Sequence, residues 1–102
     1  MQKKPYFKAV VTYYSSDKGG LINPISSGFR VNLKFPFDTQ TYIGIQTFAE
    51  TELIFPGDSL SVDFTLVNEL FLEKLYKGID FEISDNSKII GTGIVSNIYS
   101  IT

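Results

Sequence analysis

The chain has 102 residues, 43% of them hydrophobic, and a formal net charge of -2, which suits one domain with a single core. It contains no cysteine and no histidine, so disulfides, thiolate metal sites and the commonest general base are excluded. The weak net charge gives no strong attraction to DNA or to an anionic membrane, and no apolar run reaches the roughly 20 residues that span a bilayer. We therefore expect a cytoplasmic protein that has no signal peptide and no membrane partner.

Residues 7–14 predict the first strand, because the segment is short and rich in β-branched and aromatic residues. Val10 and Tyr14 make one of its faces partly apolar, as expected for a strand that is covered on both sides. The other face carries four apolar residues in a two-residue alternation: Phe7, Ala9, Val11 and Tyr13.

Residues 15–28 are expected to form a loop, since turn signals of the Gly-Gly and Asn-Pro kind occur within it. Leu21, Ile22 and Ile25 lie inside this loop. A loop that carries aliphatic residues either folds back over the core or offers a contact surface. Both alternatives stay open at this point.

Two segments alternate cleanly and predict half-buried strands. Residues 29–37 place Phe29, Val31, Leu33, Phe35 and Phe37 on one face, and residues 60–66 do the same with Leu60, Val62, Phe64 and Leu66. Pro36 indicates that the first of these strands ends in an edge or a bulge. Between them, residues 41–48 are also strand-like, and we expect Ile43 and Ile45 to face the core.

The run Pro56-Gly57-Asp58 predicts a turn between an apolar segment and the strand 60–66. Proline fixes φ, glycine can adopt a positive φ, and aspartate can bond its own backbone two residues further on. This element links the two halves of the chain.

The last third of the chain predicts a connection at 68–77 with at most a turn of helix, a strand at 79–83 and a long strand at 88–99. Gly91 and Gly93 share a face of this last strand and mark a close approach of another segment. We therefore predict an all-β fold, a closed or nearly closed antiparallel barrel of six or seven strands. It would occupy residues 6–99, between a flexible basic arm at 1–5 and a tail at 100–102.

Catalytic motifs are missing from the sequence. Serine and threonine have no histidine or cysteine partner, and Gly91-Thr92-Gly93 lacks the third glycine and the following helix of a phosphate loop. Asp80 and Glu82 are expected on the wet face of a strand. We expect neither an enzyme nor a bound cofactor.

Binding residues are the remaining functional candidates. Arg30, Lys34 and Lys88 could contact RNA, although three charges make a sparse basic surface. The aromatic and aliphatic candidates for a protein contact are Tyr42, Phe48, Tyr76, Tyr99, Leu21 and Ile22. Some of these aromatic residues could instead complete the covered outer face of the barrel.

Short motifs spread over residues 7–98 give the chain a resemblance to the third, C-terminal domain of bacterial elongation factor Tu, an antiparallel β-barrel. In chain order they are Phe7-Lys8-Ala9, Lys18-Gly19-Gly20, Pro24 with Ser27-Gly28-Phe29-Arg30, Phe55-Pro56-Gly57-Asp58, Gly78 with Phe81-Glu82-Ile83, and Gly91-Thr92-Gly93-Ile94-Val95. The resemblance implies a domain without catalytic residues that contacts the T stem of aminoacyl-tRNA, the nucleotide-exchange partner and its own GTPase domain.

The sequence departs from the family pattern on the side that the resemblance assigns to tRNA. Arg30 and Lys88 match basic positions of the family. Pro36-Phe37-Asp38-Thr39 stands where the family has Arg-Thr-Thr-Asp, and Ser84 stands where it has an arginine. The resemblance therefore favours a protein partner, such as a toxin or a translation factor, with an immunity or decoy role as one version. A tRNA-binding or RNA-binding role in translation is the alternative.

Overall fold

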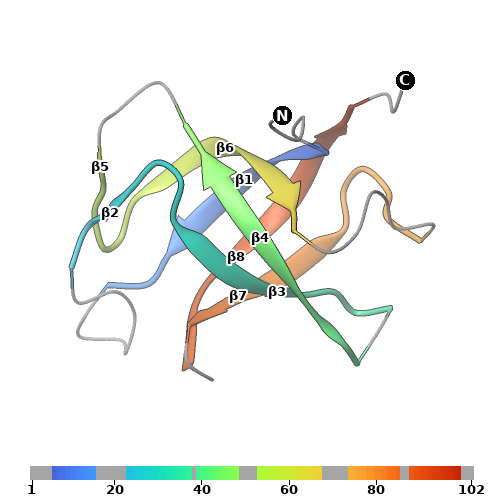
Figure 1. The fold of residues 1–102 in the computed structure, drawn as a ribbon, viewed down its shortest axis with the longest axis horizontal. Helices are drawn as coiled ribbons and strands as arrows, with labels where there is room; N and C mark the ends of the chain where they lie inside the picture. The colour runs from blue at the N-terminus through green and yellow to red at the C-terminus, as the bar shows by residue number, and fades with distance from the viewer. Residues whose placement is uncertain are drawn as a thin grey trace.

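A computed structural model of the chain describes residues 6–15, 23–37, 39–48, 53–67, 74–85 and 88–99. Six strands close into an antiparallel barrel in the order β1-β6-β4-β3-β7-β8 (Figure 1). These are β1 (Phe7–Tyr13), β3 (Arg30–Lys34), β4 (Thr41–Thr47), β6 (Ser59–Leu66), β7 (Asp80–Asp85) and β8 (Lys88–Ile98). Two short strands, β2 (Ile25–Ser26) and β5 (Leu53–Ile54), pair as a separate sheet at one end. The predicted all-β barrel is confirmed.

The interior of the barrel is filled by the faces that the alternation predicts for β1, β3, β6 and β7. Phe7, at the centre of these contacts, stacks on Phe64 with ring centroids 5.2 Å apart and meets Phe81 edge-on at 5.9 Å. Burying one such side chain stabilises the fold by about 1.5–3 kcal/mol, and a favourable ring pair adds about 0.5–1.5 kcal/mol. The fully covered residues of these strands include Ala9, Val11, Tyr13, Leu33 and Ile83.

The two glycines of β8 confirm the predicted close approach. A Cβ at Gly91 would lie 2.6 Å from the backbone oxygen of Thr12, and one at Gly93 would lie 2.4 Å from the ring of Phe81. Gly91 therefore lets β1 lie close to β8, while Gly93 makes room for an aromatic ring of the core.

The Pro56-Gly57 turn also forms as predicted. The amide of Asp58 donates to the carbonyl of Phe55 at 3.0 Å, and Gly57 has a φ of 91°, as expected at the third position of a type II turn. The side chain of Asp58 accepts from the amide of Phe55 at 2.9 Å. This side chain therefore bonds the backbone three residues earlier in the chain, and not later in the chain as predicted.

Strand β4 contradicts the prediction that Ile43 and Ile45 face the core. Its inward residues are Gly44 and Gln46, and Ile43 is 36% exposed. The cause is steric, because a Cβ at position 44 would lie 2.8 Å from Cδ1 of Leu33 and 3.2 Å from Phe64. A larger residue there would have to displace the Leu33 side chain, and the two-residue period turns both isoleucines outward when Gly44 faces inward.

Other expectations are corrected or left untested by the described residues. Val10 is 44% exposed, so β1 is not covered on both sides as predicted. Strand β3 ends at Lys34, before Pro36. Residues 74–77 of the 68–77 connection contain no helix, and residues 68–73 lie outside the described part. No helix of the described residues could cross a membrane.

Candidate functional site

The small β2–β5 sheet carries an apolar outer face at one end of the barrel. Ile25 pairs with Ile54, and both side chains point into the core. The alternation places Leu53 and Phe55 on the opposite face, where they are 37% and 50% exposed. Ser26 lies opposite Leu53, and Pro24, just before β2, is also exposed. We call Pro24, Leu53 and Phe55 the end patch.

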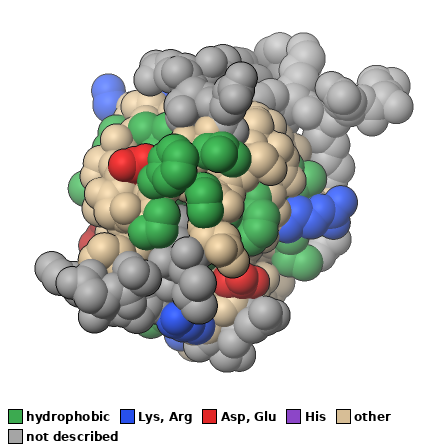
Figure 2. Space-filling view, turned by 90° about the vertical axis from the view of Figure 1, so that its left-hand side faces the viewer, with side chains coloured by type: hydrophobic (Ala, Val, Ile, Leu, Met, Phe, Trp, Pro, Cys, Tyr) green, Lys and Arg blue, Asp and Glu red, His purple; other side chains and the backbone are tan. Residues whose placement is uncertain are grey.

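Hydrophobic side chains gather at the centre of this face of the molecule, with lysine or arginine and acidic side chains at its margins (Figure 2). The end patch is anchored from beneath by the turn. The amide of Gly57 donates to the carbonyl of Tyr13 at 3.0 Å, and the amide of Tyr13 donates to the carbonyl of Asp58 at 3.0 Å. These bonds tie the turn after Phe55 to strand β1, so Phe55 is held in place although half of it is exposed.

The sequence did not mark Leu53 and Phe55 as binding residues. Both lie in the run 53–56, which was interpreted only as the approach to a turn. The signal was the alternation around Ile54, which puts its two neighbours on one face once Ile54 is buried. Ile25 folds back on the core, in keeping with one of the two alternatives for the loop 15–28, whereas Leu21 and Ile22 lie outside the described residues.

The three basic candidates do not form a continuous basic surface. Arg30 and Lys34 project outward from β3, four residues apart on the same face. Lys34 lies opposite Glu82 on β7, and Lys88 lies opposite Asp85 across the β7–β8 pair. Two of the three cations therefore have a carboxylate as cross-strand neighbour, which weakens the local positive potential.

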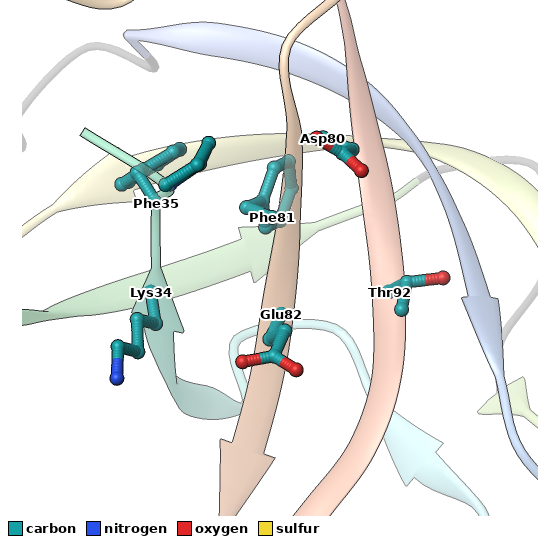
Figure 3. Close-up of a pocket in the computed structure, with 7 residues that line it drawn as sticks. Lys34, Phe35, Asp80, Phe81, Glu82 and Thr92 are labelled. Atoms are coloured by element: carbon teal, nitrogen blue, oxygen red, sulfur yellow. The ribbon is translucent and has the colours of Figure 1, made fainter. Parts of the chain in front are cut away.

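A shallow groove with mixed charge lies over β3, β7 and β8 (Figure 3). It has a volume of about 340 Å³, and Figure 3 shows Lys34 and Glu82 on adjacent strands with the Phe35 and Phe81 rings close together. Asp80 and Glu82 are exposed, as predicted for the wet face of a strand. The groove offers an ammonium and two carboxylates, without a nucleophile paired to a base. Its lining residues are Lys34, Phe35, Pro36, Asp80, Phe81, Glu82 and Thr92.

The four aromatic candidates are distributed over separate places and do not form one surface. Tyr42 and Phe48 pack against the edge of the core, Tyr42 with its ring 6.1 Å from that of Phe35. The amide of Phe48 donates to Oγ of Ser27 at 3.1 Å. Tyr76 is 59% exposed.

Tyr99 is held by a hydrogen bond rather than displayed for binding. Its hydroxyl donates to Oδ1 of Asp63 at 2.5 Å. Partial burial, and then the hydrogen bond and the negative charge of Asp63, raise the pKa of Tyr99 to about 12. The bond ties the segment after β8 to strand β6.

No three histidine, cysteine, aspartate or glutamate side chains in the described ranges lie close enough together to hold a metal ion. No protein-family model matches the chain. The candidate site that we consider below is the end patch, whose Leu53 and Phe55 are exposed.

Proposed function

We propose that the chain is a non-catalytic protein-binding module that uses the end patch as its contact surface. The observation that supports it is the apolar outer face of the β2–β5 sheet, where Leu53 and Phe55 are exposed on a backbone held by hydrogen bonds. A rigid, exposed aromatic residue beside an aliphatic one is typical of the centre of a protein interface. Held side chains also lose little entropy on binding.

The distribution of charge favours a protein over an RNA partner. Phosphate recognition needs several cations that act together, but Lys34 and Lys88 face carboxylates across the strands. Ser84, where the related family has an arginine, is the cross-strand neighbour of Asn32 on β3. Between Arg30 and Lys34, this pair therefore offers an amide and a hydroxyl group where a nucleic-acid surface would carry a further positive charge.

The resemblance to the third domain of elongation factor Tu suggests which proteins to test. A barrel of that type would bind proteins that normally dock on the complete factor. Such a protein is the nucleotide-exchange partner, or a toxin that uses the factor. Binding such a protein would make the chain a decoy or an immunity protein.

The test measures binding of the immobilised chain to the purified nucleotide-exchange partner of elongation factor Tu, with the intact factor as competitor. The double variant Leu53→Asp/Phe55→Asp should lose binding by about tenfold or more, since charges would then occupy the interface core. The matched control is Val10→Asp/Ile94→Asp, which alters two exposed apolar residues that face each other across the β1–β8 pair. It should bind like the unmodified chain.

Two results would count against the proposal. Equal losses in the two double variants would show that the end patch is not the contact surface. If the exchange partner does not bind at all, quantitative recovery of proteins from a lysate should be compared between the unmodified chain and the end-patch variant. Identical recovery from both would reject a protein-binding end patch.

A further inference from the structure

Strand β4 buries a polar residue and turns its isoleucines outward, unlike the barrel strands that bury their large apolar residues. Gln46, its most polar buried residue, is fully covered, whereas Ile43 is 36% exposed and Ile45 is partly buried. Gln46 also bears a cost, because no described residue bonds its Nε2 atom. A buried donor without a partner costs about 1–3 kcal/mol.

The steric demand at Gly44 explains the direction of the strand but not the residues it exposes. Gly44 must face inward beneath Leu33 and Phe64, so positions 43 and 45 must face outward. Outward positions of this barrel accept hydroxyl residues, as Thr41 and Thr47 of the same strand show. Isoleucine at 43 and 45 is therefore not required by the fold.

The two isoleucines adjoin a third aliphatic residue on the neighbouring strand. The amide of Val67 donates to the carbonyl of Ile43 at 2.9 Å, which sets the two residues side by side. Ile45 lies opposite Thr65 on β6. Ile43, Ile45 and Val67 thus form an apolar strip across β4 and the end of β6, which we call the β4 wall.

The charges on the two flanks of the β4 wall have opposite sign. On the β3 side, Arg30 lies opposite Ile45. On the β6 side, Asp63 lies opposite Thr47, which is two residues along β4 from Ile45. Asp63 uses Oδ1 to accept from Tyr99, and its other cross-strand neighbour is Lys8 on β1, which lies on the far side of β6 from the wall and partly offsets the charge of Asp63.

We propose that the β4 wall is the contact surface for a second copy of this chain. A two-fold axis near Ile45 would pack the aliphatic strips face to face, as sheets pack at about 10 Å. The same axis would bring Arg30 of each copy to Asp63 of the other, where the guanidinium can form a charge-assisted hydrogen bond with the carboxylate. The surface is thus complementary to itself in its apolar character and in its charges.

The small size of the strip predicts a weak dimer. Stable dimers bury about 800 Å² on each partner, whereas only three aliphatic residues form the centre of this wall. The dimer should therefore form at high micromolar rather than nanomolar concentration. It uses different residues from the end patch, so it stands independently of the proposed function.

The test is sedimentation equilibrium of the full chain across the micromolar range. The unmodified chain should show a monomer–dimer equilibrium, and Ile45→Asp should raise the dissociation constant about tenfold or more, because it buries a charge in the centre of the contact. The matched control Ile94→Asp introduces the same charge at an exposed isoleucine of β8 and should leave the equilibrium unchanged. Far-ultraviolet circular dichroism checks that both variants are folded.

A charge exchange locates the contact more sharply. Arg30→Asp should weaken the dimer, and the double variant Arg30→Asp/Asp63→Arg should restore most of the affinity. Tyr99→Phe removes the bond to Asp63 without removing its charge and should leave the dimer intact. A monomer at every concentration, an equal effect of Ile94→Asp, or no recovery in the charge exchange would overturn the proposal.

Discussion

The hydroxyl of Tyr13 donates to Oε1 of Gln46 at 2.7 Å inside the barrel. The two residues belong to β1 and β4, which do not pair, because β6 lies between them. Neither side chain is exposed, and burial raises the pKa of Tyr13 although the bond to Gln46 lowers it in part. This bond is a polar link across an otherwise apolar core, and it is made only when β4 turns Gln46 inward.

The first prediction concerns this polar pair. Tyr13→Phe should destabilise the fold by about 1–3 kcal/mol, because the buried Oε1 atom of Gln46 then loses the hydrogen bond that Tyr13 donates. The double variant Tyr13→Phe/Gln46→Leu removes both polar groups and should recover most of that loss. Urea unfolding monitored by circular dichroism measures both values. A double variant that is no more stable than Tyr13→Phe would contradict this account.

A second prediction separates the two close approaches in β8. Gly91→Ala should destabilise the barrel by about 1–3 kcal/mol, because its Cβ would meet the backbone oxygen of Thr12 and a whole strand would have to move. Thr92→Ala, at the outward position between the two glycines, serves as the control.

The control should change the free energy of unfolding by less than about 0.5 kcal/mol, as surface substitutions usually do. Thermal unfolding followed by circular dichroism compares the two variants. If Gly91→Ala is as stable as Thr92→Ala, then β1 does not lie as close to Gly91 of β8 as the structure places it.

The third prediction is a loss of stability at alkaline pH through Tyr99. Its pKa rises from 10.0 to about 12 in the folded chain, so between pH 10 and pH 12 the unfolded chain releases this proton first. The stabilisation linked to Tyr99 is therefore complete below pH 10 and is lost as the pH rises toward 12. Absorbance of the phenolate should show that Asp63→Asn lowers the pKa of Tyr99.

The variant Tyr99→Phe supplies the matching stability measurement. Its melting temperature should depend less on pH than that of the unmodified chain in the window between pH 10 and 12. Identical pH profiles for the two proteins would show that the bond between Tyr99 and Asp63 does not contribute in solution.

The fourth prediction tests the RNA alternative with aminoacyl-tRNA at about 50 and about 200 mM salt. Since Lys34 and Lys88 have carboxylate neighbours, at most about one phosphate contact should form, and affinity should fall only about fourfold between the two concentrations. A loss of several hundredfold, which Arg30→Gln makes about fourfold smaller, would restore the RNA interpretation.

Much of the barrel was predictable because its strands keep a strict apolar alternation. In β3 and β6 every second residue is apolar, so the inward face follows from the period alone, and β1 and β7 behave in the same way. The turn at Pro56-Gly57 was equally clear, since proline and glycine restrict the backbone locally. The candidate site was less predictable, because Leu53 and Phe55 are exposed only through the burial of Ile54 between them.

The sequence was enough to determine the strands and their inward faces through the apolar alternation, and it determined the turn through its proline and glycine. The tertiary structure alone decided which way β4 faces, since Leu33 and Phe64 fill the space above Gly44 only after the barrel closes. It also brought Tyr13 to Gln46, which are 33 residues apart. An alternating pattern defines two faces of a strand, but the size of the space on each side decides which face is buried.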